Sequence, residues 1–246
     1  MNTGATSRLA GRARYWAIAL TERKSVTGTD GEAAFGLWLA DELRRETAFR
    51  HAETWTIEVE PGDRRHCVAM LVRGTGRTTV VLTGHYDTVT TRDYGDLEDL
   101  ATQPQQLTQA LSKALAMADA PAARRARDDF VSGEFLAGRG LLDMKAGLAA
   151  GLAVCAELAE SPDPAGNLLF IAVPDEEKNS AGARKAAQAL PRLLASAGSK
   201  FWRRSISMRP PTTGTAARVA SSRSERWASC FRPPTSSEFP RIAVFP

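Results

Sequence analysis

Apolar and polar residues follow two different spacings along the first 200 residues of the chain, and these spacings predict alternating helices and strands. Spacing typical of amphipathic helices occurs over residues 5–24, 31–46, 105–120, from near Asp143 or Met144 to 161, and 180–196. Extended patterns occur over residues 54–60, 66–74, 78–85 and 167–174. A charged stretch around residues 124–129 is predicted as a helix or a loop.

For two of these helices, the sequence also predicts the role of single residues. Thr29 or Asp30 is expected to cap the helix over residues 31–46. Phe35, Leu37, Leu39 and Leu43 are expected to contribute its apolar surface. Pro191 is expected to kink or break the helix over residues 180–196, because proline lacks the backbone N–H that a helix interior needs.

The arrangement of these elements predicts the fold class. NLLFIAVP, residues 167–174, is a continuous apolar run and is typical of a strand buried on both faces. Strands that alternate with helices predict an α/β protein, a three-layer sandwich with a mixed, largely parallel sheet. Functional sites in such proteins lie beyond the carboxyl ends of the strands, so polar residues at strand ends are the first candidates.

The character of the chain changes near Ser199. Residues 200–246 have no sustained period and are rich in Arg, Ser and Pro, with eight arginines against two glutamates. The 200 residues before Phe201 carry 24 basic and 26 acidic side chains. We therefore predict one domain over residues 1–199 and an aberrant tail over residues 200–246 that is disordered or poorly packed. A shifted reading frame is the alternative explanation of the tail.

Composition limits the cellular compartment and the classes of binding partner that we expect for this protein. No apolar run has the length of a membrane span, and the N-terminus lacks the apolar segment of a secretion signal, so we expect a cytoplasmic protein without membrane contact. The three cysteines form no CxxC pair, which indicates neither a disulfide framework nor a cysteine zinc site. Basic residues gather in the tail without interleaved aromatic residues, and no nucleic-acid partner is expected.

The first candidate site lies in GHYDTV, at the end of the extended stretch 78–85. His85 and Asp87 are two residues apart, so an extended backbone points both to one side. A metal-binding imidazole commonly donates its other N–H to a carboxylate, which would make His85 the ligand and Asp87 its orienting partner. The alternative is a strand-end histidine with a local aspartate and no metal.

Two further segments place carboxylates at comparable positions. In GRGLLDMKAG, Asp143 follows a glycine loop and is either a metal ligand or a helix N-cap. In PDEEKNSAG, Asp175, Glu176 and Glu177 follow the buried strand and would repel one another unless cations or solvent compensated their charge. One glutamate could bind a metal while its neighbour transfers a proton, or the turn is an acidic helix start.

Together, GHYDTV, GRGLLDMKAG and PDEEKNSAG resemble, in order and spacing, the HxD, bridging-aspartate and paired-glutamate motifs of the M20 family of zinc peptidases and amidohydrolases. The resemblance spans roughly residues 10–198. SVTGTDGE at residues 25–32, DYG at residues 93–95 and the long insert before GRG are most similar to the arginine-utilisation, RocB-like branch.

The resemblance implies a function and a role for each residue. It implies hydrolysis of amide or peptide C–N bonds of small peptides or N-acyl amino acids by a metal-activated water. Two zinc ions are implied, with Co²⁺ or Mn²⁺ as substitutes. His85 and Glu177 would each bind one ion, Asp143 would bridge them, Asp87 would orient His85, and Glu176 would be the general base.

The family pattern also includes a later carboxylate ligand and a later histidine. This chain has no aspartate after Asp175 and no histidine after His85. With the resemblance, we therefore expect residues 1–199 to be a partial, M20-like catalytic domain, whose exposed sheet edge would favour self-association. The alternative is a catalytically incompetent remnant that acts at most as a metal-binding or partner-binding module.

Overall fold

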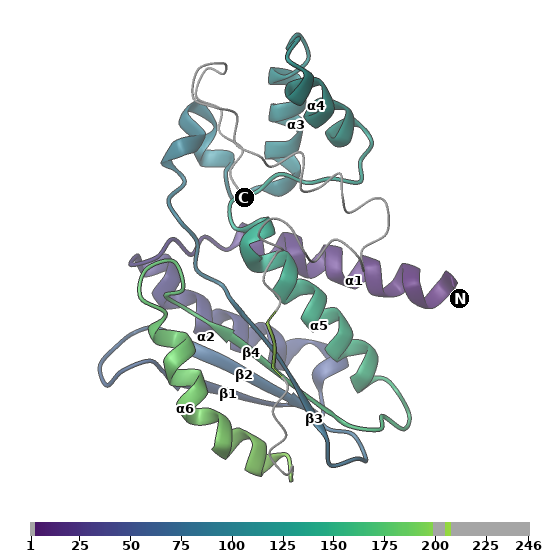
Figure 1. Cartoon of the computed structure of the whole chain (residues 1–246), viewed down its shortest axis with the longest axis vertical. Coiled ribbons are helices and arrows are strands. Elements are labelled where there is room, and N and C mark those ends of the chain that lie inside the picture. Colours follow the sequence, from purple (N-terminus) through teal and green to yellow (C-terminus); the bar gives the residue numbers. More distant parts are fainter. Residues whose placement is uncertain (1–2, 199–204, 208–246) are drawn as a thin grey trace.

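The computed structural model of the chain describes residues 3–198 and 205–207, and these residues form the predicted α/β sandwich (Figure 1). The helices and the short helical turns, labelled α and η, are α1 (Thr3–Glu22), α2 (Asp30–Arg45), η1 (Thr47–Phe49), η2 (Arg92–Leu100), α3 (Pro104–Ala114), α4 (Pro121–Val131), η3 (Leu141–Lys145), α5 (Ala146–Ala159) and α6 (Ala181–Ser196). The strands are β1 (Glu53–Glu58), β2 (His66–Val72), β3 (Thr79–His85), β4 (Asn167–Val173) and β5 (Ser205–Ser207). None of the helices in these residues is long and apolar enough to cross a membrane.

The strands form one mixed sheet in the order β1-β2-β4-β3-β5. β2 pairs antiparallel with both β1 and β4, whereas β3 pairs parallel with both β4 and β5. β5 comes from the segment that we predicted to be separate from the domain, and the rest of that segment lies outside the described residues. β1 and β5 are the edges of the sheet in the described part of the chain, and self-association through an edge stays a prediction.

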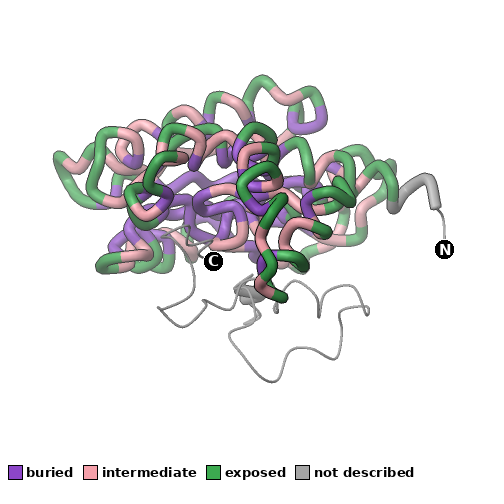
Figure 2. The backbone as a smooth tube through the Cα atoms, turned by 90° about the horizontal axis from the view of Figure 1, so that it is seen from above, coloured by how far each residue is buried: buried purple, intermediate pink, exposed green. Residues whose placement is uncertain are grey.

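Side chains of β2 and β4 alternate between two cores, because successive residues of a strand point to opposite faces. One face packs against α1, α2 and α5, and the other packs against α6. In β4, Phe170 lies in the first core while Leu169 and Ile171 lie in the second. All seven residues of β4 are buried, as the continuous apolar run predicted. Figure 2 shows buried residues, in purple, gathered in the middle of the molecule between more exposed segments.

The long insert before the glycine loop forms a third, smaller core. Tyr94 of η2, Leu107 and Leu111 of α3 and Phe130 of α4 pack together there. In Figure 1 the α3 and α4 hairpin projects away from the sheet, so this insert adds a separate layer at one end of the sandwich.

The structure refines the apolar surface predicted for the helix over residues 31–46 and contradicts a break at Pro191. Leu37 is 47% exposed, because it lies about 200° around the helix from Phe35, whereas Leu39 and Leu43 follow Phe35 at four-residue intervals on the buried face. Helix α6 continues through Pro191. Pro191 and Ala187 are exposed, so water can satisfy the carbonyl that proline leaves without its usual donor.

Gly36 allows α2 to lie close to β2, and this contact leads to a stability prediction. A Cβ at Gly36 would meet the carbonyl oxygen of His66, which is backbone and cannot rotate away. We expect Gly36→Ala to lower the free energy of unfolding by about 1–2 kcal/mol, because overpacking outweighs the better helix propensity of alanine. Urea denaturation measures this change.

Gly11 of α1 provides the matched control, because a Cβ there would have no neighbour within 4 Å. Gly11→Ala should be neutral or stabilise the protein by up to about 1 kcal/mol. Equal effects of the two substitutions would contradict the close approach of α2 to β2.

Candidate metal centre

The parallel pairing of β3 and β4 brings two of the candidate segments together. His85 at the end of β3 is in register with Val173 at the end of β4, and the Tyr86 N–H donates to the Val173 carbonyl at 2.9 Å. Parallel strands have their carboxyl ends at the same edge of a sheet. The residues after each strand therefore meet, although they are far apart in the sequence.

His85 is 4% exposed and lies at the centre of this edge. Its Nδ1 lies 3.0 Å from the backbone oxygen of Asp87 and 3.5 Å from Asp87 Oδ1. Its Nε2 lies 3.1 Å from Asp143 Oδ1 and 3.8 Å from Glu176 Oε2. Burial alone would lower the pKa of His85, but the hydrogen bonds with Asp143 and Asp87 outweigh burial and raise this pKa to about 10.

Asp143 lies in the turn η3, in front of α5, with a non-helical backbone. The N-cap of α5 is Lys145, so the N-cap alternative for Asp143 is wrong, and the helix begins later than predicted. The left-handed backbone of Gly140 starts the turn, and a Cβ there would meet the side chain of Thr88. This tight entry turns Asp143 toward His85.

The three consecutive carboxylates after β4 do not all share one environment. Asp175 has a left-handed backbone with φ of 67°, and its Oδ1 accepts a hydrogen bond from Arg65 at 2.7 Å. Its Oδ2 accepts from the N–H of Ala181, the first residue of α6, at 3.0 Å. Arg65 and the start of α6 thus compensate Asp175, which leaves Glu176 and Glu177 beside His85.

Asp87 is fully buried and contacts this turn directly. Its carboxylate accepts hydrogen bonds from the N–H groups of Glu176 at 3.0 Å and Glu177 at 3.1 Å, and from the Thr27 hydroxyl at 2.9 Å. Burial alone would raise the pKa of Asp87, but the hydrogen bonds from His85, Glu176 and Glu177 lower it. Asp87 is therefore an ionised acceptor that joins the ends of β3 and β4.

His85, Asp143 and Glu177 each offer one ligand atom, and these atoms all lie within 4.8 Å of one another. Burial raises the pKa of Glu177, as do the negative charges of Asp143, Asp87 and Glu176, while His85 opposes them. All five residues predicted for the site thus lie at one edge of the sheet. One imidazole and four carboxylates at one place form a strongly negative cluster that favours a cation.

Sequence reasoning did not assign a role to Lys145, which the structure buries completely next to the site. Its Nζ donates to the backbone oxygen of Arg23 at 2.9 Å and lies 4.8 Å from the centre of the Phe35 ring. Burial lowers the pKa of Lys145 to about 7, and the charge of Asp87 opposes this shift. Its place in GRGLLDMKAG was the only signal in the sequence.

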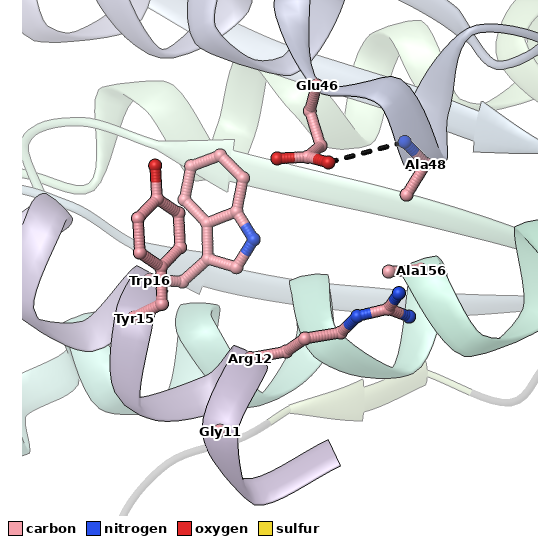
Figure 3. A pocket seen from close by; sticks show the side chains of 7 residues that line it. All are labelled: Gly11, Arg12, Tyr15, Trp16, Glu46, Ala48 and Ala156. Carbon is pink, nitrogen blue, oxygen red and sulfur yellow. Dashed lines mark hydrogen bonds between the residues drawn. The ribbon is translucent and has the colours of Figure 1, made fainter. Parts of the chain in front are cut away.

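A separate hollow lies between α1, η1 and α5 (Figure 3). Trp16 is buried in its wall, Tyr15 is 59% exposed, and Glu46 accepts a hydrogen bond from the Ala48 N–H at 3.3 Å. The residues that line it are Gly11, Arg12, Tyr15, Trp16, Glu46, Ala48 and Ala156. None of the five predicted site residues is among them, so this hollow is distinct from the metal-ligand cluster.

The sequence profile of peptidase family M20/M25/M40 matches residues 81–208. Protein YqjN of Bacillus subtilis (strain 168) is 35% identical over 173 residues, which are 70% of this chain and 31% of YqjN. Protein RocB of the same strain is 30% identical over 190 residues, which are 75% of this chain and 32% of RocB. The chain thus spans about a third of the length of these curated relatives.

A comparison with solved structures supports the fold. The structure of the di-peptidase Dug1p from Saccharomyces cerevisiae matches with a TM-score of 0.50 and 12% identity. The match covers 77% of this chain and 38% of that chain. At this identity the likeness shows the shared α/β fold alone.

Proposed function

This chain belongs to peptidase family M20/M25/M40, and from that premise we propose that it is a metal-dependent hydrolase of amide or peptide C–N bonds. One observation carries the proposal: the ligand atoms of His85, Asp143 and Glu177 lie within 4.8 Å of one another. They come from three segments of the chain, and only the fold brings them together.

The donor set fits a zinc ion. Zinc in proteins takes imidazole nitrogen and carboxylate oxygen, and neighbouring ligand atoms of a tetrahedral site lie about 3.4 Å apart. The 3.1 Å between His85 Nε2 and Asp143 Oδ1 is close to that separation. The raised pKa of Glu177 also fits, because a cation would relieve the repulsion among these carboxylates.

We propose that His85 and Glu177 would each hold one metal ion and that Asp143 would contribute to both. Co²⁺ or Mn²⁺ could replace zinc, since both accept the same nitrogen and oxygen donors. When bound, such a metal acidifies water and polarises a substrate carbonyl.

Asp87 and Glu176 have roles other than metal binding: Asp87 orients a ligand, and Glu176 transfers a proton. Asp87 orients His85 from the Nδ1 side, which leaves Nε2 directed at the ligand cluster. The Glu176 side chain is 29% exposed, with Oε2 3.8 Å from His85 Nε2. From there Glu176 can take a proton from the attacking water and return it to the leaving amine.

Substrates are proposed from the family and its relatives. Dug1p is described as a di-peptidase, and we propose small peptides or N-acyl amino acids as the substrate class for this chain. We further propose that residues 1–199 are part of a catalytic domain, in line with matches that cover only about a third of the length of the two relatives.

Removing one ligand tests the metal centre. We expect Asp143→Asn to weaken zinc binding by about 100-fold. A four-ligand zinc site in a protein has a binding free energy of about 10–16 kcal/mol, so the loss of one ligand removes roughly 3 kcal/mol. Isothermal titration of the metal-free chain with zinc chloride measures the affinity, and mass spectrometry of the purified protein measures the metal content.

The exposed Asp99 of η2 provides the matched control, and Asp99→Asn should bind zinc like the unchanged chain. Hydrolysis of dipeptides and N-acyl amino acids by the loaded chain is assayed in parallel. A chain that binds no zinc, or an Asp143→Asn variant that binds it equally well, would overturn the proposed site and favour a non-catalytic remnant.

A further inference from the structure

Three consecutive backbone N–H groups in the turn after β4 donate to carboxylates from other parts of the chain. The Asp175 N–H donates to Glu32 Oε1 at 2.9 Å. The N–H groups of Glu176 and Glu177 donate to the two oxygens of Asp87 at 3.0 and 3.1 Å. The direction of the Glu176 and Glu177 side chains thus depends on two buried acceptors.

Residues 25–32, the SVTGTDGE segment, hold these acceptors in place. The Thr27 hydroxyl donates to Asp87 Oδ2 at 2.9 Å, the oxygen that also accepts from Glu177. Glu32 is fully buried, and its second oxygen accepts from the Gly28 N–H at 2.6 Å. Each acceptor is therefore bound on two sides, by the segment and by the turn.

The segment is itself attached to the strand end that carries His85. The Ser25 hydroxyl donates to the Tyr86 carbonyl at 2.6 Å. The Thr27 N–H donates to the Thr88 carbonyl at 2.9 Å, and the Thr88 N–H donates to the Ser25 carbonyl at 3.0 Å. The segment therefore extends the hydrogen bonding of the sheet beyond the end of β3 and spans from the histidine to the paired glutamates.

We propose that residues 25–32 are a positioning element for the metal centre, in which Thr27 and Glu32 hold the turn that carries Glu176 and Glu177. Neither Thr27 nor Glu32 belongs to the ligand cluster of His85, Asp143 and Glu177, so both act through Asp87 or through the backbone. The proposal rests on the proposed function for its effect on metal affinity, but the hydrogen bonds themselves can be tested without metal.

Thr27→Val is the most direct test, because valine keeps the shape of threonine and removes the hydroxyl. Without that donor, Asp87 loses one of its partners and holds the turn less firmly. We expect the amides of Glu176 and Glu177 to exchange hydrogen about five to ten times faster in the metal-free chain. Zinc affinity should fall about tenfold, the lower end of the range for direct partners of metal ligands, because Thr27 acts one contact further out, through Asp87.

Two further variants separate positioning from general stability. Thr27→Ser keeps the hydroxyl and loses the methyl group, so it should restore slow exchange and zinc affinity. Thr56→Val, in β1 and away from the site, should change neither quantity. Rescue by serine would not occur if Thr27 contributed only packing.

Glu32→Gln tests the second acceptor. In the unchanged chain, the N–H groups of Gly28 and Asp175 each donate to a separate oxygen of Glu32. Glutamine offers only one carbonyl oxygen, so one of these two amides should exchange hydrogen faster. Zinc affinity should again fall by about tenfold. The exposed Glu60→Gln is the matched control and should behave like the unchanged chain.

The measurements distinguish failure of this inference from failure of the proposed function. Unchanged exchange in Thr27→Val and Glu32→Gln would overturn the inference, as would faster exchange with unchanged zinc affinity. Faster exchange in a chain that never binds zinc would support the hydrogen-bonded positioning element and overturn the proposed metal centre instead.

Discussion

Glu176→Gln is expected to lower kcat for hydrolysis by about 10²–10⁴-fold, the range that general acid–base catalysis contributes. Glutamine keeps the size of the side chain but cannot accept a proton from water. Glu176 is not in the ligand cluster, so zinc affinity should stay within about threefold. Steady-state kinetics of the zinc-loaded chain on dipeptides and N-acyl amino acids, with zinc titration of the same samples, measures both quantities.

Glu60→Gln again serves as the control, because it makes the same chemical change at an exposed residue outside the ligand cluster. It should leave kcat and zinc affinity unchanged. A Glu176→Gln variant with full activity would exclude Glu176 as the proton acceptor. Loss of zinc together with activity would instead make Glu176 a metal ligand.

Asp93→Ala is expected to lower the free energy of unfolding by about 3 kcal/mol, because it leaves a buried guanidinium without its counter-ion. Arg139 is 1% exposed, donates to Asp93 through Nη2, and lies 4.9 Å from the centre of the Tyr94 ring. Its Nε and Nη1 have no hydrogen-bond partner among the described residues. Asp93 is therefore its main electrostatic partner there.

Arg139→Met is expected to cost less than Asp93→Ala, below about 1.5 kcal/mol, because it removes the buried charge and keeps most of the apolar stem. The Asp93 side chain is 26% exposed and can be hydrated once the arginine is gone. Urea denaturation with a chelator present measures both variants. An Arg139→Met variant that is destabilised as much as Asp93→Ala would contradict this difference in solvation.

The local pattern of apolar and polar residues was sufficient to predict most helices and strands, but not the exposure of every residue in them. The apolar run of β4 predicted a strand buried on both faces, and the structure confirms this. The helix over residues 31–46 was predicted correctly, but residue type alone did not show that Leu37, unlike the other apolar residues named there, is exposed. Pro191 was expected to kink or break α6, but the helix does not break there, and this outcome depends on solvent exposure, which a single sequence does not contain.

For the candidate site, too, some features were predictable from local sequence and others depended on the fold. Residue type and position at a strand end singled out His85, Asp87 and the paired glutamates. Whether Asp143 was a helix cap or a neighbour of His85 depended on the backbone of the turn before α5, which the left-handed Gly140 begins. Lys145, Thr27 and Glu32 were missed as parts of the site because their contacts join residues that are distant in the chain.

The sequence by itself determined the fold class, the family and the residue types that could bind a metal, because hydrophobic period and short motifs are local properties. Only the tertiary structure decided which of these groups meet, since the parallel register of β3 and β4 sets His85 beside the turn of Glu176 and Glu177. It alone decided how Asp87 acts, as an ionised acceptor shared by that turn and Thr27. Burial and hydrogen bonding across the fold control these properties, and neither follows from local sequence.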